Sequence, residues 1–163
     1  MVTNIMLLET SKFGEVEVNE DLIFIFVEPI LGYEHLKKYA LIDHMTDSPF
    51  KWLQSVEDKN VSFPITVPSF FGINYEFVIP EDEAKKLEAK SAEDILSLNI
   101  VNIPNGHPEN ATINLLGPVV VNVNNKKAMQ LVLRNSEHSV RYRLFDEGIK
   151  FESKKEADVP DVK

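Results

Sequence analysis

The sequence contains no cysteine, only six glycines and a single tryptophan in 163 residues. The absence of cysteine excludes disulfides, thiolate nucleophiles and Cys-ligated zinc or iron–sulfur sites, and it fits a cytosolic protein. The few glycines form neither a dinucleotide fingerprint nor a phosphate-binding loop. No apolar run approaches the roughly 20 residues needed to span a membrane, and the N-terminus lacks the basic region of a signal peptide. We therefore expect a cytoplasmic protein without membrane contact.

Basic residues are also in the minority. The chain has 17 Lys and Arg against 26 Asp and Glu, a formal net charge of −9. This balance disfavours direct nucleic-acid binding, because the phosphates would be repelled. It favours a basic partner protein in association rate and specificity. The alternative, that the acidic surface only maintains solubility, stays open from charge alone.

Alternation of apolar and polar residues with a period of two recurs along most of the chain, with turn residues between short segments. This pattern predicts an all-β, mainly antiparallel fold: a small β-barrel-like domain with one short helix. We expect residues 1–146 to form a single domain and the charged residues 147–163 to be a disordered tail. The predicted strands cover residues 5–9, 15–19, 22–27, 39–42, 50–56, 61–67, 74–79, 95–103, 112–116, 119–123, 129–133 and 139–144.

Four local features carry further expectations. The all-apolar run 22–27 suits a strand that is buried on both faces, and residues 33–39 have the spacing of a short helix or 3₁₀ turn. Pro64 would place the strand 61–67 at a sheet edge or a bulge. Pro80 followed by three acidic residues and later lysines predicts a helix over 81–89, with Ser91 and Asp94 as a capping box for a further turn.

No arrangement of catalytic residues is evident. The four histidines are far apart and none has the spacing of a metal-ligand pair. They are His35, His44, His107 and His138. The carboxylate clusters at 57–58 and 81–83 are typical of a turn and of a helix N-terminus. We therefore expect a non-enzymatic protein without cofactor or metal, monomeric in the absence of partners.

Aromatic side chains, by contrast, gather at strand ends and in loops. Trp52 is assigned to the core. The adjacent Phe70 and Phe71 point in opposite directions in an extended segment, so one of them is expected at a protein interface.

Several segments resemble the flagellar assembly factor family, FliW. The most specific is Pro49-Phe-Lys-Trp-Leu-Gln-Ser-Val-Glu57, which matches the family's P-F-x-W-L-Q-S-x-E segment. Gly32-Tyr-Glu-His-Leu36 resembles its G-F-E-x-L segment, and Ile100-Val-Asn-Ile-Pro104 its I-V-x-I-P run. The stretch from Ala111 to Asn122 resembles its T-x-N-L-x-x-P-I-x-I-N run. The family's F-P-x-G-I-P-G-F segment is not kept here, where residues 24–33 read FIFVEPILGY.

The resemblance implies a cytoplasmic, chaperone-like protein that binds newly made flagellin. It also implies binding to the carbon storage regulator CsrA, a small basic RNA-binding repressor of flagellin translation, so that repression is relieved. The candidate partner-binding residues are Tyr33, Glu34, Gln54, Glu57, Phe70, Phe71 and Tyr75. The runner-up interpretation is a β-barrel that binds a small ligand such as a flavin, which a deep apolar cavity would favour.

Overall fold

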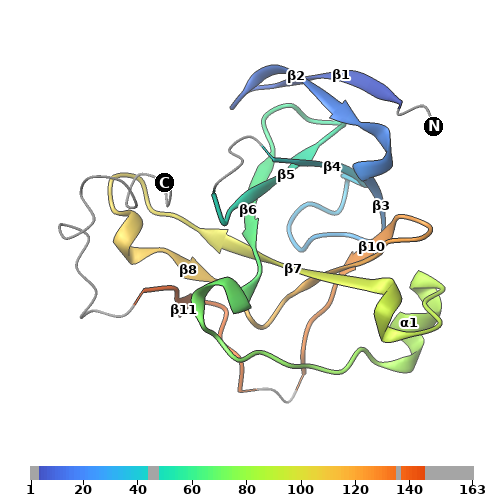
Figure 1. Cartoon of the computed structure of the whole chain (residues 1–163), viewed down its shortest axis with the longest axis vertical. Helices are drawn as coiled ribbons and strands as arrows, with labels where there is room; N and C mark the ends of the chain where they lie inside the picture. The colour runs from blue at the N-terminus through green and yellow to red at the C-terminus, as the bar shows by residue number, and fades with distance from the viewer. Residues whose placement is uncertain (1–3, 44–47, 135–136, 146–163) are drawn as a thin grey trace.

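A β-barrel forms the centre of the protein (Figure 1). The computed structural model describes residues 4–43, 48–134 and 137–145, and the structural statements below refer to these residues. Within them, seven strands close into the barrel through the additional pairing of β7 with β9. In order around the barrel they are β7 (Ile95–Asn102), β6 (Ser62–Thr66), β5 (Lys51–Ser55), β4 (Lys38–Ile42), β3 (Ile23–Glu28), β10 (Lys127–Gln130) and β9 (Val119–Asn122).

The strand pairings in the barrel are antiparallel except for one. β10 runs parallel to β3, with a register irregularity between Ala128 and Met129. The predicted fold class, a mainly antiparallel barrel-like domain with one short helix, is confirmed. The expected tail, residues 147–163, lies outside the described residues.

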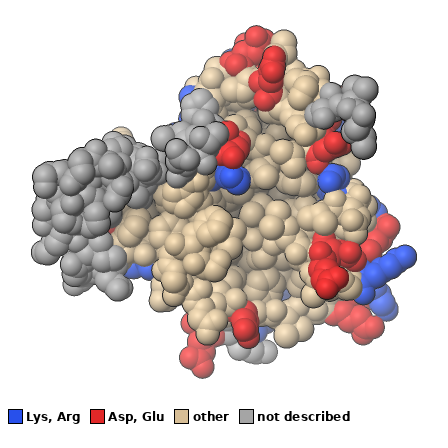
Figure 2. All heavy atoms as spheres, viewed as in Figure 1, with Lys and Arg blue, Asp and Glu red and all other residues tan. Residues whose placement is uncertain are grey.

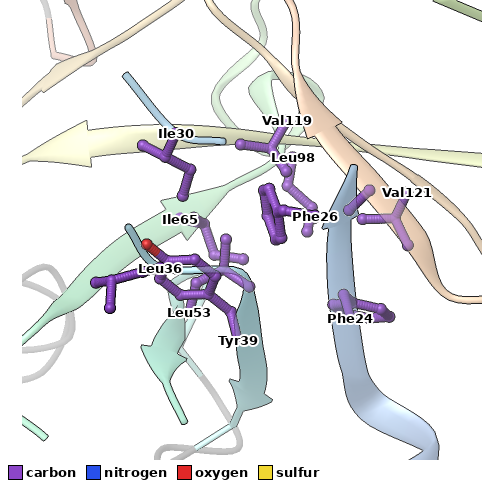
Figure 3. Packing of buried hydrophobic residues seen from close by; sticks show 11 residues of the cluster. Phe24, Phe26, Ile30, Leu36, Tyr39, Leu53, Ile65, Leu98, Val119 and Val121 are labelled. Atoms are coloured by element: carbon purple, nitrogen blue, oxygen red, sulfur yellow. The ribbon is translucent and has the colours of Figure 1, made fainter. Parts of the chain in front are cut away.

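The barrel interior is filled by side chains from its strands and from the loop after β3 (Figure 3). Tyr39 and Leu53 are fully buried, and the Tyr39 ring lies 5.0 Å from the ring of Phe26. The small-ligand interpretation requires a deep apolar cavity. Among the described residues, the barrel interior holds a packed core of side chains instead. The cluster comprises Phe24, Phe26, Ile30, Leu36, Tyr39, Leu53, Ile65, Leu98, Val119, Val121 and Ala128.

A separate hairpin covers the outer face of the barrel. β1 (Ile5–Thr10) and β2 (Gly14–Asn19) pair with each other, as predicted, and not with the barrel strands. Their inward side chains Leu8 and Val18 pack on Ala40, Ile42 and Trp52. The strand β5 is consequently covered on both faces, by the barrel core at Leu53 and by the hairpin at Trp52.

The remaining elements are short. In the part of the chain that the structure describes they are one α-helix, α1 (Glu81–Leu87), strands β8 (Thr112–Ile113) and β11 (Tyr142–Arg143), and the 3₁₀ turns η1 (Glu20–Leu22), η2 (Pro68–Phe71), η3 (Ala92–Asp94) and η4 (Pro108–Asn110). The helix starts after Pro80 as predicted but ends two residues early, because Glu88 adopts the left-handed conformation at φ 58°. The predicted capping box of Ser91 and Asp94 is present.

Several local predictions are corrected by the structure. β3 is buried on one face only, since Ile25 and Val27 are 47% and 37% exposed on its outer face. Of the short helix or 3₁₀ turn predicted over 33–39, a single turn forms, in which the Leu36 N–H donates to the Tyr33 oxygen at 3.0 Å, and β4 begins at Lys38. Pro64 lies inside the sheet, opposite Trp52, and is tolerated because the β7 ladder begins only at Ile65.

Candidate partner-binding surfaces

The outer face of the β1–β2 hairpin combines aliphatic and acidic side chains. Ile5 and Leu7 are 52% and 60% exposed, and the carboxylates on the same face are also exposed. Successive side chains of a β-strand point to opposite faces, so the residues that alternate with these exposed ones point inward, toward the barrel. Figure 2 shows acidic side chains gathered over this hairpin, at the top of the view. We define the acidic hairpin face as Ile5, Leu7, Glu9, Glu15 and Glu17.

The hairpin register brings like charges together. Glu9 lies directly opposite Glu15, and Leu7 opposite Glu17. The four salt bridges among the described residues involve none of these carboxylates. Like charges directly opposite each other are destabilising in a sheet. A cationic partner would therefore relieve a repulsion that the free protein carries.

A second surface is a groove beside α1. Its volume is about 790 Å³, and three extended or turn segments and the helix line it. Three of its aliphatic residues are strongly exposed: Leu31 at 63%, Val78 at 84% and Val132 at 45%. We define the side groove by the residues that line it, which are Glu28, Pro29, Leu31, Glu34, Glu76, Phe77, Val78, Pro80, Glu83, Lys86, Met129, Gln130, Leu131, Val132, Leu133, Arg134 and His138.

Charged side chains surround the side groove. Lys86 Nζ lies 3.0 Å from Glu28 Oε2, and this hydrogen bond raises the pKa of Lys86. Glu34 Oε2 accepts a hydrogen bond from the backbone N–H of Gly32 at 2.9 Å, which lowers the pKa of Glu34. Both groups are thus held in their charged forms at neutral pH.

The aromatic candidates differ in exposure. Phe70, on η2, is 63% exposed, whereas Phe71 is half-buried and packs against Phe50 and Phe145. One of the two is therefore exposed and the other packed, but both lie in the 3₁₀ turn η2, so the extended segment from which opposite directions were expected is not present. Tyr33 is half-buried, with its ring edge-on to that of Phe63 at 5.0 Å.

Two polar candidates are used inside the molecule. Gln54 has no exposed surface, and its Nε2 lies 3.1 to 3.2 Å from the carbonyl oxygens of Ser55, Lys59 and Val61. Burial leaves it no atom to present to a partner, so its position assigns it to the turn after β5. Glu57 Oε1 accepts hydrogen bonds from the backbone N–H groups of Lys37 and Lys38, at 2.6 and 3.1 Å, and so holds that turn to β4.

Tyr75 joins two distant segments. Its hydroxyl donates to the backbone oxygen of Leu115 at 2.6 Å, and its ring packs against Phe77 and His138. Burial raises the pKa of Tyr75 to about 12.

This shift predicts an alkaline loss of stability. The unfolded phenol ionises near pH 10, and the folded one only near 12. Between these values the folded state binds more protons, so the free energy of unfolding should fall as pH rises through this window. Denaturant melts at pH 9 and pH 11 measure it, with Tyr75→Phe as the matched variant. An equal pH dependence in the Tyr75→Phe variant would show that Tyr75 does not contribute.

Sequence reasoning missed the acidic hairpin face and the side groove. The sequence did contain a signal for the acidic hairpin face. The run Ile5-Met-Leu-Leu8 is apolar at four consecutive positions, and in a strand every second side chain of such a run must point outward. The side groove had no such signal in the sequence, because it forms between segments that are about 50 residues apart in the chain.

No group of three or more His, Asp or Glu side chains gathers as a metal site within residues 4–43, 48–134 and 137–145. His44 lies outside the described residues. None of the helices in the described part of the chain is long and apolar enough to cross a membrane.

Comparison with known proteins agrees on one family. The family model described as "FliW protein" matches residues 7–144. The chain is 41% identical over 146 residues to the flagellar assembly factor FliW of Caldicellulosiruptor saccharolyticus, covering 90% of this chain and 95% of the relative. It is 39% identical over 138 residues to that of Thermotoga neapolitana, covering 85% and 93%. A crystal structure of the flagellar assembly factor FliW superimposes with a TM-score of 0.79 at 26% identity, covering 88% of this chain and 100% of the other.

Proposed function

Since the chain belongs to the FliW family of flagellar assembly factors, we propose that it is a non-enzymatic cytoplasmic protein that binds flagellin and the basic RNA-binding repressor CsrA. Capture of the repressor would relieve repression of flagellin synthesis. Export of flagellin would free the protein for this capture.

The acidic hairpin face is the observation that carries the proposal. It offers three carboxylates that form no salt bridge with a described residue, beside two exposed aliphatic side chains on one face of the hairpin. Opposite charges steer encounter, and the aliphatic centre gives the contact an apolar part to bury. A net charge of −9 placed beside an RNA site would also repel phosphates without occupying the site.

The other exposed candidates fit a second contact. Phe70 is a large apolar side chain on the surface and suits an anchor in a partner's pocket. Glu34 is exposed at the rim of the side groove. Tyr33, Phe71 and Tyr75 are half-buried, and we propose that they support the contact surface from within the molecule.

The test is kinetic. The association rate between this protein and CsrA should fall as salt rises from about 50 to 300 mM, because the Debye length shortens to about 8 Å at 0.15 M and less above it. The dissociation rate should change less. Coupling between binding sites is reciprocal, so saturating RNA should weaken the affinity for CsrA by the factor by which this protein weakens RNA binding.

Each part of the proposal can fail separately. A salt-independent association rate would remove the electrostatic argument. Undiminished RNA affinity at saturating amounts of this protein would remove the antagonism. Absence of flagellin binding in the same assay would leave only the regulator as a partner.

A further inference from the structure

Extended backbone forms one wall of the side groove, and one edge of it is unpaired. The N–H groups of Leu131 and Leu133 donate to the backbone oxygens of Pro118 and Leu116, at 2.8 and 2.9 Å. In extended backbone the intervening residue points its N–H and C=O to the opposite side. Val132 therefore presents its backbone toward the groove that it lines, and within the described residues it makes no hydrogen bond.

The opposite wall is extended and unpaired as well. Residues 74–79 alternate between exposed and half-buried, as predicted for a strand, yet they join no sheet formed by the described residues. None of their backbone N–H groups donates a hydrogen bond to a described residue, and the Glu76 oxygen accepts one, from His138 Nε2 at 3.3 Å. The strand predicted at 74–79 is therefore wrong for the described residues, which keep the alternating exposure but supply no strand to pair with this segment.

Aliphatic side chains line the surface between the two walls. Leu31, Val78 and Val132 are exposed within the groove, and Val140 is 50% exposed in an adjoining hollow of about 280 Å³. The hollow and the groove share Leu31, Gln130 and Val132, so they form one continuous depression. Exposed apolar surface of this kind marks a contact site when polar residues surround it.

The charged side chains around the groove indicate the charge of the partner that would fit it. Four carboxylates line the groove, from Glu28, Glu34, Glu76 and Glu83, against the cations of Lys86 and Arg134. Lys86 is engaged by Glu28, so Glu34, Glu76 and Glu83 leave an acidic excess.

We propose that the side groove binds an extended segment of a partner polypeptide as an added β-strand, with aliphatic side chains at alternate positions and Lys or Arg between them. Main-chain hydrogen bonds to Val132 and to residues 74–79 would supply the pairing. The aliphatic side chains would enter the depression around Leu31 and Val132. The basic side chains would meet the acidic rim.

This inference depends on the proposed function in one respect, which is that the groove is taken to bind a partner protein. It can be tested without either partner, because the chain has no cysteine and one introduced thiol is unique. The Val78→Cys variant is equilibrated in a glutathione buffer with a synthetic peptide: an N-terminal cysteine, a two-glycine spacer and three Lys-Val repeats. Tethering places the peptide at millimolar effective concentration, so weak intrinsic affinity does not hide binding.

Ile25→Cys is the matched control protein. Ile25 is also an exposed aliphatic residue, but its strand β3 is paired on both sides, by β4 and β10. Two control peptides complete the design, one with N-methylated valines and one with Glu in place of Lys. The readouts are the mixed-disulfide fraction and the hydrogen exchange rate of the Val132 amide.

At the Val78→Cys thiol, the Lys-Val peptide should be retained at least about tenfold more strongly than the N-methylated one, the change expected for two lost backbone hydrogen bonds. The Val132 amide should exchange correspondingly more slowly, and the Glu-Val peptide should be retained less. At the Ile25→Cys thiol the peptides should not differ. Equal retention of the Lys-Val and N-methylated peptides at the Val78→Cys thiol, or an unprotected Val132 amide, would overturn strand addition. Equal retention of the Lys and Glu peptides would overturn the basic character of the occupant.

Discussion

Replacing Trp52 with alanine is expected to lower the free energy of unfolding by about 3 kcal/mol, the lower end of the range for a buried Trp. The indole is only half-buried, but it joins the hairpin to the barrel. Its ring lies 5.5 Å from that of Phe13 in an edge-on arrangement, and Lys12 Nζ lies 4.5 Å above it. Alanine would remove these contacts and leave a cavity beneath Leu8 and Val18.

Chemical denaturation followed by circular dichroism measures this loss. Trp52→Phe is the control, because it keeps an aromatic ring against Phe13 and should cost less. Leu53→Ala, on the opposite face of the same strand, should cost about 2–5 kcal/mol by opening the barrel core instead. Unchanged stability of Trp52→Ala together with lost partner binding would make Trp52 an interface residue.

Reversing charge on the acidic hairpin face should slow association with CsrA by about 10- to 100-fold at low salt. Glu15→Lys and Glu17→Lys each add two positive charges and so move the net charge from −9 to −5. The same double variant should be more stable by about 0.2–1 kcal/mol, because the Glu9–Glu15 repulsion becomes an attraction. Binding and stability would thus change in opposite directions.

Stopped-flow association with CsrA measures the rate, and a denaturant melt measures the stability. A second double variant, Glu81→Lys with Glu93→Lys, has the same net charge but changes the region of α1 and η3 at the other end of the molecule (Figure 1). It should slow association much less. If both double variants slow association equally, the effect comes from net charge and the hairpin face is not the contact.

The features that could be predicted from the sequence depend on interactions between residues that are close together in the chain. The β1–β2 hairpin and the start of α1 each follow from residues that are close together in the sequence. The alternation at 74–79 was equally local, and it reports which side chains face inward. It cannot report whether a neighbouring strand is present, because that neighbour comes from elsewhere in the chain.

The sequence by itself determined the period-two pattern, the acidic charge and the family, since each depends on the order and type of residues alone. Only the tertiary structure decided how the barrel closes, through the parallel β3–β10 pair and the long-range β7–β9 pair. It also decided that Gln54 is buried on three backbone carbonyls while Leu7 is exposed. Burial depends on what packs against a residue, and segments distant in sequence supply that packing.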